Sequence, residues 1–440
     1  MKLALDNKKV VQAWWMYDWA NSVYNLVITT TFFPIYFLGV TKSTFGENDV
    51  PFLGRTFKNS SLYDFTLAFA YLSIALLLPI LSSIADSQGN KKRFMQFFCF
   101  LGGLSCIGLF WFKGANIGWG IACFIGAVIG YAGSLVFYNS YLPEIAALED
   151  RDKVSARGFM MGYIGSVILQ MIGFGLVLYF QANGDKTSGP LITFFLVGIW
   201  WIGFAQITFA YLPKGKPSAD KSGTNFLTDG FKELAKVLKQ VRSLGVLNWY
   251  LASFFFYSMG VQTVMLAAAM FGSKMLGLPP TKLIITLVVI QLVAVVGATL
   301  IARLSAIFGN INVLMAIVIL WIVSCGAAYV IATESEAGVN VEYYFYTLAA
   351  LVGLVMGGIQ SLSRSTYSKL MPVTRDTASF FSFYDMTEKI AIVIGIFTFG
   401  LIDEVLGMKN SVLSLIVFFI LGFIALAITR SKQLKLAKSN

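Results

Sequence analysis

The chain has 440 residues, of which 57% are hydrophobic and only 12% are charged. Water-soluble domains are nearer to half apolar and a quarter charged, so this composition excludes a water-soluble fold. The net charge of +11 would suit a polyanion-binding protein, but membrane proteins collect Lys and Arg on their cytoplasmic loops, so nucleic acid is not expected as a partner.

Apolar runs of about twenty residues, such as Phe65 to Ile84 and Ile311 to Ala332, indicate membrane-spanning helices rather than the short alternating strands of a barrel. Twelve helices are predicted near 13–39, 63–84, 94–112, 117–139, 157–180, 190–212, 246–272, 282–303, 311–332, 342–366, 380–402 and 411–429. We therefore expect an all-α membrane protein with twelve transmembrane helices.

The distribution of basic residues predicts the orientation of the chain. With the N-terminus placed inside, the loops on that side hold 24 Lys and Arg residues and the opposite loops hold 8, while Lys389 lies within a span. Because the excess of Lys and Arg marks the cytoplasmic side, we expect both termini to be cytoplasmic. The expected location of the chain is a bacterial inner membrane.

The first predicted span carries a polar stripe on an otherwise apolar helix. Asp18, Asn21, Ser22, Asn25 and Thr29 recur at α-helical spacing, and such a face cannot meet lipid. A carboxylate at this depth must pair, become protonated or face water. The stripe predicts a helix that lines a cavity. For Asp18, a structural cap bonded to neighbouring backbone or to a Lys is an equally good interpretation.

The loop after the second span, Ala85 to Arg93, combines an acid at a helix end, a turn glycine and a basic cluster. With Asp86, Gly89 and Lys91 at matching positions, it resembles the signature loop of the major facilitator superfamily. The loop and its approach depart from that pattern at three positions, Ser82, Ser87 and Asn90. The resemblance implies a latch formed by Asp86, Gly89, Lys91 and Arg93, with Asp86 charge-paired in one access state and released in the other. The alternative is a simple positive-inside loop.

The longest internal polar stretch, Pro213 to Leu244, divides the spans six and six, and Tyr17 and Tyr24 of the first span recur as Tyr250 and Tyr257 of the seventh. Two six-helix halves related as parallel repeats are the layout of major facilitator carriers. We expect an N-terminal half over 1–212, a cytoplasmic linker over 213–245 and a C-terminal half over 246–440.

The predicted linker contains apolar residues at helical spacing, with Lys and Arg on its other faces. The apolar positions are Leu227, Phe231, Leu234, Leu238 and Val241. This pattern predicts an amphipathic helix that lies on an anionic lipid surface or, alternatively, packs under the bundle.

The eleventh span places Asp385, Glu388 and Lys389 within five residues at membrane depth. Asp385 and Lys389 are one turn apart and can pair, which leaves Glu388 to find another partner or a proton. We hypothesise that Glu388 or Asp385 titrates with transport while Lys389 tunes it. The alternative is a purely structural network between helices. With no His in the chain, proton coupling would have to use such acids or a shifted Lys.

Four segments spread over the chain resemble the vacuole effluxer, or autophagy-protein-22-like, family of the major facilitators, in a compact prokaryotic-type form. They are Tyr17 to Ser22, Tyr138 to Glu144, Ser363 to Tyr367 with Pro372, and Phe380 to Asp385. Ser382 stands where the family usually has Gly. The resemblance implies a twelve-helix carrier of the major facilitator fold, with amino-acid efflux as the best-known family activity.

The expected function is secondary active transport of a small polar solute, and the expected partners are that solute, protons as coupling ion, and membrane lipids around a monomer. Candidate cavity residues are Asp18, Asn21, Tyr24, Asn25, Asn139, Gln170, Arg364 and Tyr384. Such mixed polar groups suit a zwitterion, and Arg364 suits its carboxylate unless it is a positive-inside anchor. A receptor or scaffold on a carrier fold and a drug or metabolite exporter are the alternatives.

Neither a cofactor nor enzymatic chemistry is expected. No phosphate-binding motif or nucleophile elbow occurs in the sequence. The four cysteines, Cys99, Cys106, Cys123 and Cys325, lie in apolar stretches without metal-ligand spacing.

Overall fold

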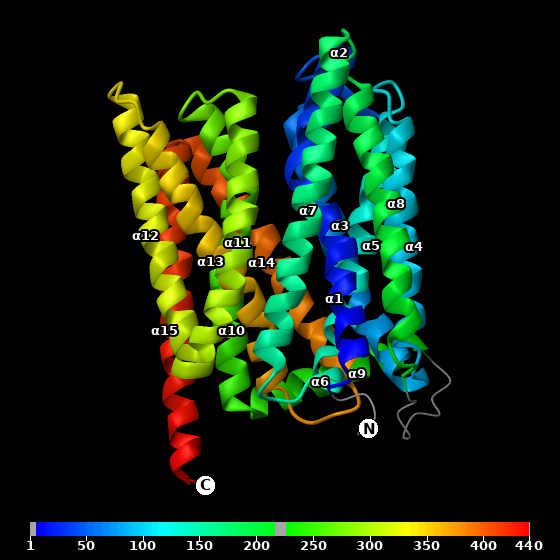
Figure 1. The fold of residues 1–440 in the computed structure, drawn as a ribbon, viewed down its shortest axis with the longest axis vertical. Helices are drawn as coiled ribbons and strands as arrows, with labels where there is room; N and C mark the ends of the chain where they lie inside the picture. The colour runs from blue at the N-terminus through cyan, green and yellow to red at the C-terminus, as the bar shows by residue number, and fades with distance from the viewer. Residues whose placement is uncertain (1–5, 216–225, 440) are drawn as a thin grey trace. The chain divides into compact units, whose positions relative to one another are not determined.

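The computed structural model describes residues 6–215 and 226–439, and most of them are helical (Figure 1). Contacts divide the chain into two units. The first comprises Met1–Tyr141 with Met161–Gly230, and the second comprises Leu142–Met160 with Phe231–Asn440. Helix α7 is therefore shared, since its first residues group with the second unit and the rest with the first.

The first unit contains the spans of the N-terminal part. Its elements are α1 (Lys8–Val23), the π-helix η1 (Tyr24–Phe32), α2 (Phe33–Phe45), β1 (Val50–Phe52), β2 (Arg55–Phe57), α3 (Asn59–Gln88), α4 (Lys91–Gly108), the 3-10 turn η2 (Leu109–Trp111), α5 (Ile117–Asn139), most of α7 (Arg151–Ala182) and α8 (Ser188–Tyr211).

The second unit contains the C-terminal spans and the start of α7. Its other elements are α6 (Leu142–Ile145), most of α9 (Phe226–Ser243), α10 (Gly245–Lys274), α11 (Pro280–Phe308), α12 (Asn310–Glu336), α13 (Glu342–Leu370), α14 (Thr377–Leu406) and α15 (Met408–Ser439).

Each of the twelve predicted spans coincides with one helical segment, with Lys8–Phe45 and Lys91–Trp111 as continuous spans, and the spans 94–112 and 190–212 end one residue beyond theirs. Eleven helices of the described chain are long and apolar enough to cross a membrane. Helix α14 is equally long, but it carries Asp385, Glu388 and Lys389 in one half and two more acids near its end. The twelve-helix membrane fold is thus confirmed, and α14 differs from the other spans in the charges it carries rather than in its apolar residues.

The loop between α2 and α3 forms a small hairpin that the hydropathy pattern did not predict. Strands β1 and β2 pair antiparallel, with Val50 opposite Phe57 and Phe52 opposite Arg55. The turn residues Leu53 and Gly54 both have positive φ, 49° and 77°, which is the geometry of a tight hairpin turn. The hairpin therefore follows from turn chemistry rather than from apolar periodicity.

Close helix contacts in the second unit depend on small residues. A Cβ added at Gly353 would lie 2.5 Å from the carbonyl oxygen of Ile290, and one at Gly357 would lie 2.1 Å from that of Ala294. Gly297 of α11 meets Leu354 of α13 in the same way, at 2.1 Å. Backbones approach this closely only where glycine or alanine occupies the interface, as in other membrane helix pairs.

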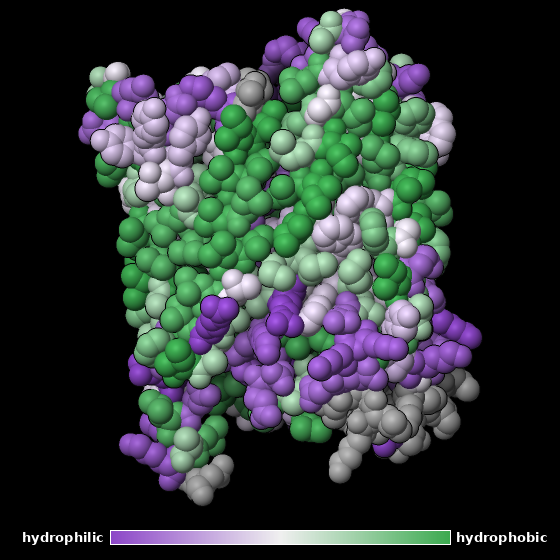
Figure 2. Space-filling model, in the orientation of Figure 1, coloured by the Kyte–Doolittle hydropathy of each residue, from purple (hydrophilic) through white to green (hydrophobic). Residues whose placement is uncertain are grey.

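Hydrophobic side chains cover the middle of the face displayed in Figure 2, and hydrophilic ones gather toward its ends. Long apolar side chains are exposed on the outer surfaces, for example Phe69 at 60% and Leu76 at 72% on α3. Exposed apolar side chains of this kind would favour aggregation in water. On a membrane protein they form the surface that contacts lipid.

Candidate functional site

Asp18 of α1 is buried against α5. The hydroxyl of Tyr138 donates to Asp18 Oδ2 over 2.7 Å, and the indole N–H of Trp14 donates to the Tyr138 carbonyl over 3.0 Å. The rings of Trp14 and Tyr138 stack with centroids 4.4 Å apart. The structure therefore gives Asp18 a tyrosine partner on the fourth span, immediately before Asn139, which neither sequence interpretation named.

The first span changes its winding after Val23. Tyr24–Phe32 is a π-helix, and Thr31 Oγ1 donates to the Leu26 carbonyl five residues earlier over 2.9 Å. Because π-helical hydrogen bonds join residues five apart, the α-helical spacing does not hold here. The prediction of one stripe at that spacing from Asp18 to Thr29 is therefore wrong beyond Tyr24. Single π-turns inside α-helices are frequent at functional sites.

Five side chains of this span have buried polar atoms that meet no hydrogen-bond partner among the described residues. One is Trp19, which is half-buried, and the other four are fully buried. They are Tyr17, Asn21, Tyr24 and Thr29, each no more than 1% exposed, and both amide atoms of Asn21 are affected. A buried polar atom without a partner costs about 1–3 kcal/mol, and native proteins keep few of them. We name these four residues the α1 polar cluster. They are strong candidates for contact with a polar solute.

The other amides predicted to line the cavity differ in their surroundings. Asn25 is half-buried on η1, and Asn139 is buried at the end of α5. Gln170 of α7 is fully buried, and its Nε2 donates to Thr31 Oγ1 over 3.4 Å. Gln170 is thus brought to the π-helical part of the first span.

Arg364 of α13 is buried and bonded to the start of α7. Its Nε donates to Ser155 Oγ and its Nη2 to the Ser155 carbonyl, each over 2.9 Å. The guanidinium also lies over the ring of Phe159, 4.3 Å from the centroid. An anion bound bidentately by Arg364 would have to compete with Ser155.

Tyr384 of α14 belongs to a buried aromatic cluster in the second unit. Its ring stacks on Phe254 with centroids 4.1 Å apart. Nearby on α10, the Tyr250 hydroxyl donates to the Ser363 carbonyl, and the Tyr257 hydroxyl shares a hydrogen bond with Ser363 Oγ, both over 2.7 Å. The recurring tyrosines of the seventh span are therefore hydrogen-bonded, whereas Tyr17 and Tyr24 belong to the α1 polar cluster.

Glu388 is paired with its sequence neighbour. Lys389 Nζ lies 2.6 Å from Glu388 Oε2, and Gln262 Nε2 of α10 donates to Glu388 Oε1 over 3.0 Å. The side chain of Lys389 is 4% exposed and that of Glu388 is 19% exposed. Gln262 is the separate partner expected for Glu388, whereas its ion pair with Lys389 was not expected, because the sequence assigned Lys389 to Asp385. The pairing of Asp385, which is buried, with Lys389 stays a prediction.

A polar network that the sequence did not reveal holds the start of α7. Asp152 accepts hydrogen bonds from Lys369 over 2.5 Å, from Asn310 over 2.8 Å and from Ser305 over 3.1 Å. Lys369 also donates to Asn310 Oδ1 over 3.3 Å. We call these four residues the α7 clamp. All of them belong to the second unit.

The α7 clamp escaped prediction because Lys369 was counted only as an ordinary loop charge and its partners were not singled out. One signal was present in the sequence. The loop after α11 repeats, as Gly309 and Asn310, the Gly89 and Asn90 of the signature-like loop after α3. A repeated turn at matching places in two halves indicates that both loops serve the same purpose.

In the signature-like loop, Gly89 ends α3 with φ of +66°, the left-handed conformation that glycine adopts readily. Asp86 and Lys91 are buried, and the Lys91 ammonium lies 5.2 Å from the centroid of the Tyr141 ring. Arg93 is exposed. The structure confirms the turn glycine, and the partner exchange of Asp86 stays a prediction.

Comparison with known sequences decides the family. The profile of the family described as "Vacuole effluxer Atg22 like" matches residues 6–437. A relative from Bacillus subtilis, named an uncharacterized MFS-type transporter YxiO, is 31% identical over 95% of this chain and 94% of its own. The chain belongs to the vacuole effluxer family. Autophagy-related protein 22-1 of Penicillium rubens is 30% identical to this family member over 59% of the chain, which spans 46% of the fungal protein.

Solved structures place this effluxer-family member in the major facilitator fold. The human organic anion transporter MFSD10 (TETRAN) superposes with a TM-score of 0.72 at 11% identity, covering 95% of this chain and 99% of that one. The proton:xylose symporter XylE gives 0.71 at 14% identity, covering 95% and 94%. These relatives are membrane transporters and not enzymes, as the sequence led us to expect.

The linker of this effluxer-family member is only partly described, because residues 216–225 and the side chains of Leu227, Phe231 and Leu234 lie outside the described residues. Within α9, Val241 is buried, Leu238 is half-buried and the basic residues are exposed. Lys236 lies 3.8 Å from Asp376 at the start of α14. These contacts favour the amphipathic helix packed under the bundle over the lipid-surface helix.

Within the part of the chain that the structure describes, no three Cys, Asp or Glu side chains gather as metal ligands would. The cysteines of this effluxer-family member are all buried and free.

Proposed function

We propose that this protein is a secondary active transporter that moves a small polar solute by alternating access, with amino acids as the leading substrate class. The observation that carries the proposal is the α1 polar cluster, whose hydroxyl and amide atoms are buried without partners among the described residues. A solute with donors and acceptors satisfies such atoms, and an apolar drug does not. The family description as effluxers supports export as the direction.

Glu388 and Lys389 are the proposed coupling pair. The Glu388 carboxylate and the Lys389 ammonium lie 2.6 Å apart at membrane depth. When a proton binds Glu388, the acid becomes neutral and this strong ion pair is lost. Gln262, the second donor to Glu388, lies on another helix, so protonation would also loosen the contact between α10 and α14.

The α7 clamp is the proposed gate. It joins the shared helix α7 to the ends of α11 and α13 and the start of α12 within the second unit. Alternating access requires such contacts to form in one state and break in the other. Both termini are proposed to lie in the cytoplasm of a bacterial cell, where the protein acts as a monomeric carrier.

The test is flux in lipid vesicles that contain the purified protein. We expect labelled amino acids to cross the membrane of these vesicles and not of empty ones. Binding of the labelled solute without flux would support a receptor instead, and flux of apolar drugs alone would support a drug exporter.

The variant Asn21→Leu tests the α1 polar cluster. Leu has nearly the size of Asn but leaves no unpartnered amide, so we expect the folded state to gain about 1–3 kcal/mol while solute flux is lost. The matched control is Thr208→Val, because the Thr208 hydroxyl is buried and already donates to the Ala13 carbonyl over 2.7 Å. This control should lower stability by about 1 kcal/mol and keep flux. A transporting Asn21→Leu protein would contradict the proposed site.

A further inference from the structure

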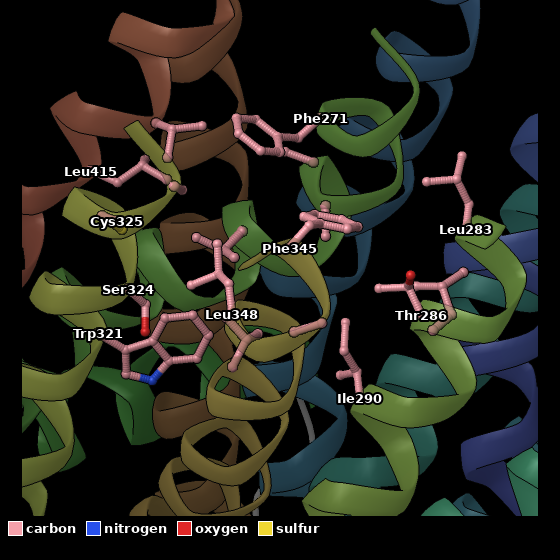
Figure 3. A pocket seen from close by; sticks show the side chains of 18 of the residues that line it. Phe271, Leu283, Thr286, Ile290, Trp321, Ser324, Cys325, Phe345, Leu348 and Leu415 are labelled. Carbon is pink, nitrogen blue, oxygen red and sulfur yellow. The ribbon is translucent and has the colours of Figure 1, made fainter. Parts of the chain in front are cut away.

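A largely apolar pocket lies inside the second unit, toward the end where α10 ends and α13 begins (Figure 3). It measures about 720 Å³ when the open space at its mouth is included. Side chains of α10, α11, α12 and α13 line it, together with Phe399 of α14 and two residues of α15. Its enclosed part is only about 70 Å³, so a longer ligand must extend outward through the open mouth.

The lining carries almost no polarity. None of its residues is charged, and its two hydroxyls are engaged, since Thr286 donates to the Lys282 carbonyl and Ser324 to the Leu320 carbonyl, each over 2.8 Å. A zwitterion or a sugar would lose its hydration there without compensation. The pocket therefore excludes the polar solute of the proposed function and favours hydrocarbon.

One polar group in the lining has no partner among the described residues. The indole N–H of Trp321 is fully buried, and the ring stacks on Phe419 with centroids 5.6 Å apart. Figure 3 shows the Trp321 ring beside Ser324 on the α12 side of the pocket, below Leu348. A ligand with a long apolar body matches this lining.

The mouth of the pocket opens between α10 and α11. The lining residues that keep part of their surface exposed are Val264 and Ala268 of α10 and Leu283 and Leu287 of α11. Exposed apolar side chains continue outward from it, with Met270 at 43% and Ile285 at 51%. Such apolar side chains suit contact with acyl chains.

We propose that this pocket, which nothing in the transport proposal requires, is a binding site for the acyl chain of a lipid. The chain enters between α10 and α11 and packs against the apolar lining beside the Trp321 ring. The chain is supplied by a membrane phospholipid or by a free fatty acid. Transport and acyl binding are separable, because the α1 polar cluster and this pocket share no residue.

Heavy-atom quenching of Trp321 tests the proposal directly. The protein is placed in nanodiscs of phosphatidylcholine with brominated chains, or in unbrominated nanodiscs with brominated fatty acid added. We expect quenching that is absent from Trp321→Phe and is weakened by Ala328→Leu, which fills the pocket. The matched control Ala327→Leu, outside the lining, should leave quenching unchanged. Exposed Trp111 and Trp119 must be quenched in every protein, which verifies the probe.

Quenching by the phospholipid identifies a membrane lipid as the ligand, and quenching by the fatty acid alone identifies the free acid. Quenching of the exposed tryptophans without any Trp321 component overturns the proposal, whatever the flux assay shows. Cys325, which also lines the pocket, gives a second measurement that needs no Trp321 variant. In a protein with Cys325 as sole cysteine, lipid at about ten times its Kd should slow labelling by an apolar maleimide about tenfold. Unchanged labelling would equally overturn the proposal.

Discussion

The residues of the α1 polar cluster make the folded protein less stable than an apolar span would be. Tyr17, Asn21, Tyr24 and Thr29 are buried as deeply as core residues, yet their polar atoms find no partner among the described residues. Stability and function commonly oppose each other at binding sites, because groups arranged for a ligand are left unsatisfied by the fold. Asp18 differs in this respect, since Tyr138 satisfies it.

Variants of the coupling pair in α14, Glu388 and Lys389, can separate an effect on stability from an effect on coupled transport. Glu388→Gln breaks the ion pair with Lys389, so we expect lower thermal stability together with loss of gradient-driven transport, while exchange of solute across the membrane persists. The double variant Glu388→Gln/Lys389→Met removes the buried ammonium as well. Its thermal stability should return toward the wild-type value, and its coupling should not.

Measuring gradient-driven uptake, exchange and thermal unfolding on the same preparations distinguishes the two interpretations. A purely structural network predicts that the double variant recovers coupled transport together with stability. Recovery of both would therefore eliminate Glu388 as the coupling group.

Hydropathy predicts the membrane-spanning helices of this protein but misses two of its local elements. Runs of apolar residues locate all twelve spans, because lipid demands continuous apolar surface over a fixed length. They do not reveal the π-helix over Tyr24–Phe32, since its Leu, Val, Ile and Thr residues are apolar enough for either winding. They also miss the hairpin at Leu53 and Gly54, which depends on backbone angles.

The contact between α11 and α13 makes a prediction at this scale. Gly357→Ala places a Cβ against the backbone of Ala294, which cannot move aside as a flexible side chain would. We expect a loss of about 1–3 kcal/mol in the free energy of unfolding, the usual effect of overpacking. Thermal unfolding in detergent measures it.

Gly326 of α12 provides the control for this experiment, because a Cβ there meets nothing within 4 Å. Gly326→Ala should leave the stability unchanged or raise it by up to about 1 kcal/mol, since Ala favours helix. Equal effects at the two positions would show that helix propensity, rather than the close approach of α11 and α13, sets the result.

At the scale of the whole molecule, the sequence predicted the family and the number of spans but not the contacts that govern movement. Tyr138 and Asp18 are far apart in sequence, as are Asp152 and Lys369, and hydropathy carries no information on which polar groups meet. The division of α7 between the two units likewise depends on contacts. Polar and charged residues within apolar runs identified the candidates of the first and eleventh spans, whereas pairing required coordinates.

The α7 clamp yields a prediction about conformational change. Asp152 and Lys369 are mostly buried, so removing either charge should favour the state in which the clamp is open. The reporter is Ser368→Cys in a protein without the native cysteines. Ser368 is fully buried, and its hydroxyl makes no hydrogen bond within the described chain, so this substitution disturbs little. A water-soluble maleimide then reacts with the cysteine only when the clamp opens.

In this background, Lys369→Met should speed labelling of Ser368→Cys by at least about tenfold. This corresponds to a loss of about 1.4 kcal/mol in the free energy that favours the closed clamp. Asp152→Asn should act alike, and the double variant should label no faster than either, because one change already breaks the pair. Lys409→Met removes the more exposed ion pair with Glu336 elsewhere in the unit and should not alter labelling. Additive effects of Asp152→Asn and Lys369→Met would mean that the two residues act independently and that the clamp is no gate.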